Sequence, residues 1–221
     1  MKGRPGMGRQ ARAEATREAV LLAAATAFDQ HGYDGTSLSD IVRVFGKSKG
    51  AVYFHFDSKQ ELARAVMAAQ ADDLPVLTSG SAIQDLIELT MQIGQRLRTD
   101  VRLRAGVRLA IEQASFISPD SSPYNLWIDV ARQFLTTARA DRELQAHVDP
   151  DACAQMIVGA FTGIQLLSQV SSERADLTHR LGVLWTSLLP GMVTPAVLRR
   201  ITLAQPAEAV GSPTLRTQPR R

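Results

Sequence analysis

The sequence predicts an all-α protein with a small N-terminal helix-turn-helix domain and a larger helical domain after it. Apolar residues recur every three to four positions over most of residues 11–189, which is the period of an amphipathic helix. No segment shows the alternation of a half-buried strand. Glycine, proline and capping residues interrupt the helical pattern at intervals typical of helix ends. At 221 residues and 45% hydrophobic, the chain is long enough to bury a substantial core.

The first helix is expected from about Ala11, with a core-facing stripe at Val20, Leu21, Ala24 and Phe28. This helix ends in the segment QHGYDG, where Gly32 occupies the position that favours a left-handed backbone after a helix.

The second helix follows the segment TSLSD and runs to about Phe45. Thr36 or Ser37 can cap it, and Asp40 stands three residues after Ser37, as in a capping box with Asp in place of Glu. Its apolar residues fall at i, i+3, i+4 and i+7: Leu38, Ile41, Val42 and Phe45. This spacing predicts one buried face.

The third and fourth helices are separated from their neighbours by equally clear signals. Gly46 ends the second helix, and Ser48 can cap a short third helix from Lys49 to about Phe54. Asp57 or Ser58 can cap the fourth helix, which is expected to extend to about Leu74.

Pro75 and the segment TSGS predict a boundary between two domains. We therefore divide the chain into an N-terminal domain (1–57), a connecting helix (58–75), a C-terminal domain (76–205) and a disordered basic tail (206–221). Further helices are expected at about 82–98, 101–114, 124–140, 151–170 and 173–189.

Charge is unevenly distributed along the chain. Residues 1–60 contain 9 Lys and Arg against 6 Asp and Glu, whereas residues 61–198 contain 11 against 15. A basic N-terminal region followed by an acidic region favours an anionic partner for the N-terminal domain.

The segment GKSKGAVYFHF, residues 46–56, has the composition that a DNA-reading helix requires. Hydrogen-bond donors stand at its start, a small residue allows close approach to DNA, and a tyrosine hydroxyl can donate to a phosphate. The residues in these roles are Lys47, Ser48, Lys49, Gly50 and Tyr53, with Val52 and Phe56 as apolar anchors. A solvated turn followed by ordinary core packing explains the same spacing about equally well.

Residues 16–62 resemble the DNA-binding region of the TetR family of transcriptional repressors. The matching features are Gly-Tyr before the Thr-Ser cap, Lys-Gly before Tyr-Phe-His-Phe, and Ser-Lys-x-x-Leu at the fourth helix. The resemblance implies an all-α homodimer bound to double-stranded, roughly palindromic operator DNA and released by a small molecule. It implies DNA contacts from Thr36, Ser37, Lys47, Ser48, Lys49, Gly50, Tyr53 and His55, with Lys59 at a phosphate. The long fourth helix then joins this domain to a ligand-binding and dimerisation domain.

The segments RLRAGVRLAIEQASF and PYNLWIDVARQFLTTAR resemble the γ-butyrolactone autoregulator receptors, which control secondary metabolism in actinobacteria. The resemblance implies that Trp127 contacts the ligand, where its ring can form a flat pocket wall; plain core packing is the alternative. Polar candidates, by position only, are Gln113, Thr162, Gln165 and Ser168. The resemblance also associates a basic isoelectric point with pseudo-receptors, which respond to antibiotics or their precursors, and the value here is about 9.3.

A dimer interface is expected on the last two helices. Small residues of the helix at 151–170 permit close helix approach, and leucines recur at i, i+4, i+7 and i+11 in the helix after it. The first helix carries Ala152, Met156, Gly159, Ala160 and Gly163 at this spacing, and the second carries Leu177, Leu181, Leu184 and Leu188.

Catalysis and metal binding are not indicated by the sequence. Its 4 histidines are dispersed without metal-ligand spacing, and Cys153 is the single cysteine. We expect a cytoplasmic regulator, not an enzyme, with no cofactor and no membrane segment. A small-molecule-binding protein without operator function is the rival hypothesis.

Overall fold

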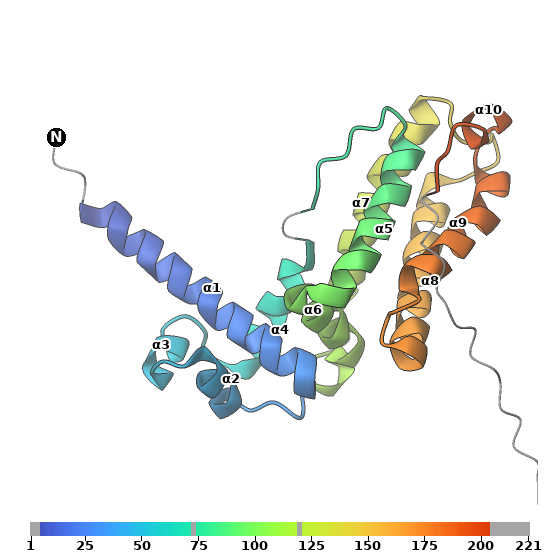
Figure 1. Cartoon of the computed structure of the whole chain (residues 1–221). Helices are drawn as coiled ribbons and strands as arrows, with labels where there is room; N and C mark the ends of the chain where they lie inside the picture. The colour runs from blue at the N-terminus through green and yellow to red at the C-terminus, as the bar shows by residue number, and fades with distance from the viewer. Residues whose placement is uncertain (1–4, 72–73, 119–120, 204–221) are drawn as a thin grey trace, which may run out of the picture. The chain divides into compact units, whose positions relative to one another are not determined.

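The computed structural model describes residues 5–71, 74–118 and 121–203, and the regular elements in these ranges are all helices (Figure 1). The α-helices are α1 (Pro5–His31), α2 (Leu38–Phe45), α3 (Lys49–Tyr53), α4 (Lys59–Ala68), α5 (Ala82–Thr99), α6 (Val101–Glu112), α7 (Ser122–Ala140), α8 (Pro150–Ser172), α9 (Leu177–Met192) and α10 (Pro195–Leu198). The 3₁₀ helices are η1 (Ala69–Ala71) and η2 (Gln113–Ser115). The predicted all-α fold is confirmed.

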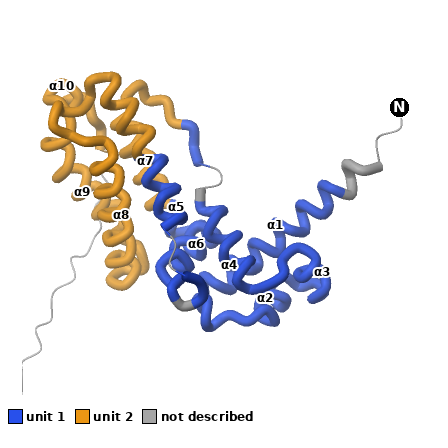
Figure 2. The backbone as a smooth tube through the Cα atoms, turned by 180° about the vertical axis from the view of Figure 1, so that it is seen from behind, with its two compact units in different colours: residues 1–76, 96–131 blue, residues 77–95, 132–221 orange. Residues whose placement is uncertain are grey.

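The chain forms two compact units, coloured separately in Figure 2. Unit 1 comprises residues 1–76 and 96–131, and unit 2 comprises residues 77–95 and 132–221. Helices α5 and α7 therefore each contribute to both units. The expected tail at 206–221 lies outside the described residues.

The core of unit 1 is built around α1, whose predicted apolar stripe is buried. Val20 and Phe28 are fully buried, and α2, α4 and α6 pack against this helix (Figure 1). Ile41 fixes α2 in the core, while Val52 and Phe56 fix the segment around α3. The apolar anchors predicted from spacing thus hold the helix-turn-helix in place.

Local signals set the ends of these short helices as predicted. The Ser37 Oγ accepts the N–H of Asp40, and the Asp40 carboxylate accepts the N–H of Ser37, which completes the capping box. Gly46 closes α2 with a φ of 69°, a left-handed conformation that glycine adopts without steric cost. Ser58 caps α4 by accepting the N–H of Glu61.

Three predicted helix boundaries were wrong. Helix α1 begins at Pro5 instead of about Ala11. Helix α4 ends at Ala68 and continues only as the 3₁₀ turn η1, so the connecting helix is shorter than expected. The last long helix begins at Leu177 instead of residue 173, because Glu173 and Arg174 both have positive φ and form the connection from α8.

The core of unit 2 is formed by α5, the end of α7, α8 and α9. Trp185 is fully buried on α9, where its indole N–H donates to the Thr90 hydroxyl of α5 at 2.8 Å. Leu177 and Leu181 of the predicted leucine stripe are also fully buried in this core. They stabilise the unit itself and are not available at its surface.

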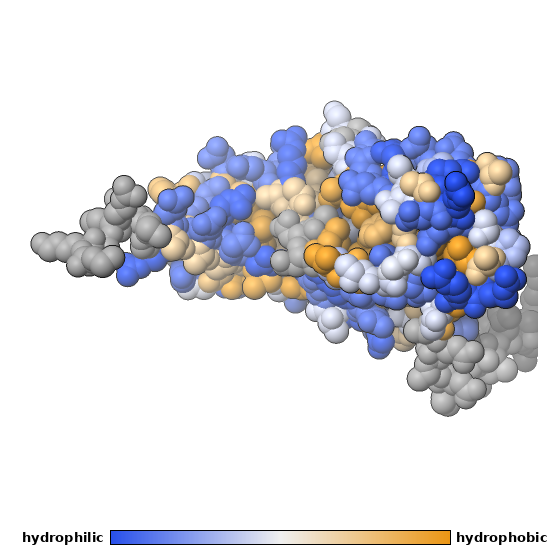
Figure 3. Space-filling model, turned by 90° about the horizontal axis from the view of Figure 1, so that it is seen from above, coloured by the Kyte–Doolittle hydropathy of each residue, from blue (hydrophilic) through white to orange (hydrophobic). Residues whose placement is uncertain are grey.

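Hydrophobic side chains nevertheless reach the surface in several places, as the face in Figure 3 illustrates. On α8 they include Val170, which is 82% exposed, and Leu167, which is 62% exposed. Helix α8 is long and apolar enough to cross a membrane by length and composition alone. Only 22% of its most apolar window is buried in the structure. This helix therefore carries an apolar face that unit 2 does not cover.

Candidate nucleic-acid interface

The predicted reading residues form one exposed surface at α3 and the turn before it. Lys47, Ser48, Lys49 and Gly50 are exposed, and Tyr53 is 41% exposed. The Lys49 ammonium lies 5.5 Å from the centre of the Tyr53 ring, so these two side chains share one face of the helix. The surface combines cationic donors with a phenol hydroxyl, the groups that contact phosphates and base edges.

Gly50 leaves this surface open. A Cβ atom built at this position would meet no heavy atom within 4 Å. The space above α3 is therefore free for a partner that approaches its backbone.

Phe54 is exposed next to these residues, although its place in the sequence predicted no role for it. Its side chain is 78% exposed, and its ring meets the ring of His55 edge-on at 5.0 Å between centroids. The exposed ring is apolar surface that a partner could remove from water. The sequence could have predicted this exposure. Val52 and Phe56 lie four residues apart on the buried face of the helix, and Phe54, midway between them, points to the opposite face.

Three predicted contact residues have their polar groups engaged within unit 1. Thr36 is 2% exposed and its hydroxyl donates to Gly32 O at 2.7 Å, so its side chain is absent from the interface surface. Lys59 donates to Tyr33 O at 2.9 Å and Thr36 O at 3.0 Å. The Ser37 hydroxyl is exposed but donates to Asp40 within the capping box.

Lys59 is half-buried because its ammonium also lies 3.9 Å from the centre of the Tyr33 ring. This arrangement fixes the start of α4 against the connection between α1 and α2. For the phosphate contact expected from sequence, the Lys59 ammonium would have to bind a phosphate in addition to the two carbonyl oxygens and the Tyr33 ring.

A polar network from α6 holds the same connection from the other side. Arg104 forms an ion pair with Asp29, and Arg108 donates to Asp29 O at 2.8 Å. Glu112 pairs with Arg108 at 2.7 Å and accepts the N–H of Tyr33 at 2.9 Å. The end of α1 and the entry to α2 are therefore tied to α6 by several hydrogen bonds.

Gly32 allows the close approach on which this network depends. It has a φ of 70°, and a Cβ there would lie 2.7 Å from the Arg108 guanidinium and 2.8 Å from a Glu112 oxygen. Any side chain at this position would displace the network as well as strain the backbone.

The predicted effector residues divide between the two units. In unit 1, Trp127 is half-buried and its indole N–H lies 3.4 Å from the Gln70 side-chain oxygen, while Gln113 is buried at the end of α6. In unit 2, Thr162 is half-buried, whereas Gln165 and Ser168 are buried on α8.

Ser168 and Thr162 use their hydroxyls locally, whereas the Gln165 amide does not. The Ser168 hydroxyl donates to Asp176, and the Thr162 hydroxyl donates to Val158 O within α8. The side-chain nitrogen of Gln165 is buried with no hydrogen-bond partner among the described residues. Of the polar candidates on α8, Gln165 has the donor that remains unsatisfied.

Comparison with known proteins identifies the class of protein. Residues 20–66 match the family model of the bacterial regulatory proteins of the tetR family, and residues 80–194 match the tetracyclin repressor-like C-terminal domain. The chain therefore belongs to the TetR family, a class of helix-turn-helix transcriptional regulators rather than enzymes.

Within this family the chain is similar to butyrolactone-receptor-like regulators. It is 37% identical to the A-factor receptor protein of Streptomyces griseus over 195 residues, which cover 88% of this chain and 70% of that protein. TylP, a TetR regulator from Streptomyces fradiae, is 37% identical with a TM-score of 0.80, covering 87% of this chain and 93% of its own. A gamma-butyrolactone receptor (ArpA-like protein) is 32% identical with a TM-score of 0.65, covering 86% and 93% of the two chains. The predicted family and subgroup are confirmed.

Proposed function

We propose that this protein is a ligand-responsive repressor that binds a pseudo-palindromic operator as a homodimer and is released by a small molecule. The observation that carries the proposal is the exposed surface of Lys47, Ser48, Lys49 and Tyr53, held on a rigid core by buried Val52 and Phe56. Such a surface needs an anionic partner with grooves about the width of a helix, and the major groove of DNA has that shape.

In this proposal the start of α3 enters the major groove. Lys47, Ser48 and Lys49 reach base edges or phosphates, and the Tyr53 hydroxyl donates to a phosphate. Phe54 packs against the sugar edge or a thymine methyl group, which would cover its exposed ring. His55 and the Ser37 hydroxyl stay at the margin of the contact, and Thr36 and Lys59 position the domain.

We propose that the apolar face of α8 forms the dimer interface together with α9. Val170, Leu167 and Met156 on α8 and Val183 on α9 are exposed hydrophobic residues, and Gly159 and Gly163 are exposed between them. A second copy of the chain would cover this face with the equivalent helices, in the manner of a four-helix bundle. It would also supply the two-fold symmetry that a palindromic operator requires, with recognition helices about 34 Å apart.

The effector is proposed to be a γ-butyrolactone-type signal that contacts Trp127. The half-buried indole of Trp127, on the part of α7 that belongs to unit 1, supports a ligand with an apolar body. The names of the A-factor receptor and the gamma-butyrolactone receptor support the same class. By linkage, the effector releases DNA only through its higher affinity for the state that does not bind the operator.

A second candidate function is that of a pseudo-receptor that answers to antibiotics or their intermediates. The basic isoelectric point of 9.3 favours it. Both functions place the protein in the cytoplasm as a regulator of antibiotic biosynthesis.

The proposal is tested by a gel shift on the promoter next to the protein's own gene. Bound DNA is then titrated with a γ-butyrolactone, a butenolide and an antibiotic. Release by the butyrolactone supports the receptor, and release by the antibiotic alone supports the pseudo-receptor. The absence of any specific shift would contradict operator binding and favour a ligand-binding protein without operator function.

A further inference from the structure

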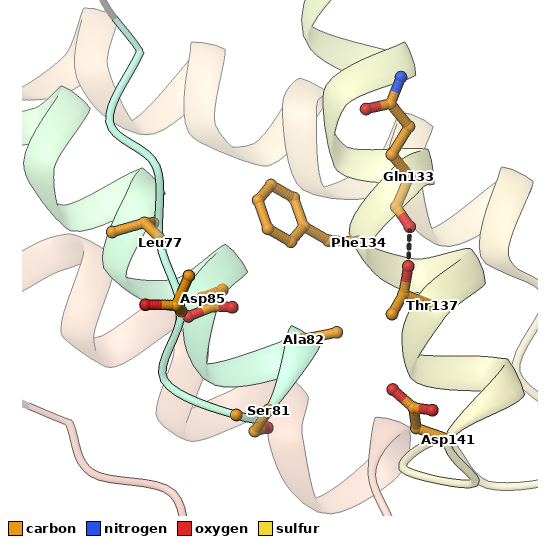
Figure 4. Close-up of a pocket in the computed structure, with 10 residues that line it drawn as sticks. Leu77, Ser81, Ala82, Asp85, Gln133, Phe134, Thr137 and Asp141 are labelled. Carbon is orange, nitrogen blue, oxygen red and sulfur yellow. Dashed lines mark hydrogen bonds between the residues drawn. The ribbon is translucent and has the colours of Figure 1, made fainter.

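A cavity of about 540 Å³ lies within unit 2, where the first turns of α5 face the last turns of α7 (Figure 4). The segment 77–81, which leads into α5, closes one side. None of the five predicted effector residues lines this cavity. It is therefore a site separate from the one proposed at Trp127.

The walls of the cavity combine apolar and acidic groups. Leu77 and Asp85 lie on one side in Figure 4, and Phe134 on α7 and Asp141 just after α7 lie on the other. Hydroxyl groups of Ser81 and Thr137 lie on the same walls. The described lining residues include two carboxylates and no Lys, Arg or His, so the interior has negative charge without an internal counter-charge.

Asp85 is the more buried of the two carboxylates. It is only 8% exposed, and its Oδ1 accepts the N–H of Ser79 at 2.8 Å. Its other oxygen has no hydrogen-bond partner among the described residues. A largely buried carboxylate is stabilised by a hydrogen-bond donor or a cation, and the cavity that Asp85 lines is a route by which such a group can reach it.

From this geometry we propose that the cavity binds a small organic cation, an amine with an apolar body. The ammonium group donates to Asp85 and pairs with Asp141, which is exposed at the cavity. The apolar body packs on Leu77 and on the ring of Phe134, whose face also attracts a cation. The volume is within the range of about 300–1,000 Å³ found for small-molecule sites.

Binding of an amine in this cavity does not depend on operator binding or on the effector site at Trp127. Binding is measured with the full chain in the absence of DNA, so failure of operator binding and failure of the cation site are separate results. The probe is 4-phenylbutylamine, compared with its neutral analogue 4-phenylbutan-1-ol and its anionic analogue 4-phenylbutyrate.

Isothermal titration at neutral pH should detect the amine, with the alcohol about tenfold weaker and the carboxylate not bound. Asp141→Asn is the first variant, because an exposed side chain can lose its charge without loss of folding; it should weaken amine binding about tenfold. Asp85→Asn keeps the acceptor for Ser79, and it should weaken amine binding at least as much. Phe134→Leu should weaken the amine and the alcohol together.

Asp129→Asn, which removes one charge from α7 outside the cavity, is the matched control and should leave amine affinity unchanged. Trp127→Ala should also leave it unchanged. Equal binding of alcohol and amine, or full amine affinity in Asp141→Asn and Phe134→Leu, would overturn the proposal. So would absence of any amine binding at 10 mM probe, about the weakest affinity that a site of this kind could have.

Discussion

The guanidinium of Arg104 on α6 forms an ion pair with the carboxylate of Asp29 near the end of α1. Its Nε lies 3.1 Å from both carboxylate oxygens, and its Nη2 lies 2.7 Å from Oδ2. The hydrogen bonds that the guanidinium donates to the Asp29 carboxylate raise the pKa of Arg104. Because α1 forms the centre of the DNA-binding core, this pair fixes α6 to the body that carries the recognition helix.

Asp29→Asn should destabilise unit 1 by about 1–2 kcal/mol, because Arg104 and Asp29 are 22% and 19% exposed and the arginine loses its charged partner. Urea denaturation measures the change. Glu18→Gln is the matched control, since its pair with Arg102 joins the same two helices at 45% and 36% exposure and should contribute about 0.5 kcal/mol or less. Equal losses in the two variants would show that the Asp29 pair has no special role.

Tyr53→Phe should weaken operator binding about tenfold, because it removes a hydroxyl that donates to a charged phosphate. Gel shifts on operator and on unrelated DNA should show the same loss, since phosphate contacts do not depend on sequence. Tyr124→Phe is the control, because its hydroxyl lies 3.3 Å from Ala110 O inside unit 1. An unchanged affinity in Tyr53→Phe would remove Tyr53 from the phosphate contacts.

Trp127→Ala should leave operator binding intact and abolish release by the effector. The loss of the indole wall removes apolar contact with the ligand, whereas the DNA surface around α3 keeps its residues. Effector titrations of the protein–DNA complex measure both properties. Normal release by this variant would exclude Trp127 from the effector site.

Val170→Glu should convert the dimer to a monomer, because it places a charge on an 82% exposed valine that a second copy is proposed to bury. Light scattering after size exclusion reports the mass. Val76→Glu is the matched control, since Val76 is 91% exposed and lies outside α8 and α9. This variant should keep the molecular mass of a dimer. A dimer in both variants would place the interface elsewhere.

Asp176 should make stability depend on acid pH. Burial alone would raise its pKa, but hydrogen bonds from Ser168, Ser172 and Arg180 lower it to about 2, against an ordinary value of 3.8. The ionised carboxylate therefore stabilises the fold above about pH 4, and this contribution is lost as the pH falls towards 2. Thermal melts of the protein and of Asp176→Asn should differ at pH 6, and the difference should shrink steadily as the pH falls from about 4 to 2. A constant difference across this range would contradict the assignment.

The sequence by itself determined the local structure of the DNA-binding unit. Ser37, Asp40 and Gly46 act within a few residues of themselves, through a capping box and a left-handed glycine, so their pattern suffices to set the ends of α2. The spacing of Val52 and Phe56 likewise predicted the anchor of α3. The residues matching the TetR pattern then indicated which exposed side chains would face DNA.

Tertiary structure decided which polar groups remain available for a partner. The Thr36 hydroxyl and the Lys59 ammonium fit a DNA contact by sequence, but carbonyl groups brought together by the fold accept their hydrogen bonds. Leu177 and Leu181 fit a dimer stripe, but packing in unit 2 buries them. Asp85 and Phe134 lie far apart along the chain and line one cavity only because the fold places the start of α5 opposite the end of α7. The periodicity of a sequence indicates which face of a helix is apolar. Contacts between residues distant in sequence decide what covers that face and which hydrogen-bond donors have acceptors.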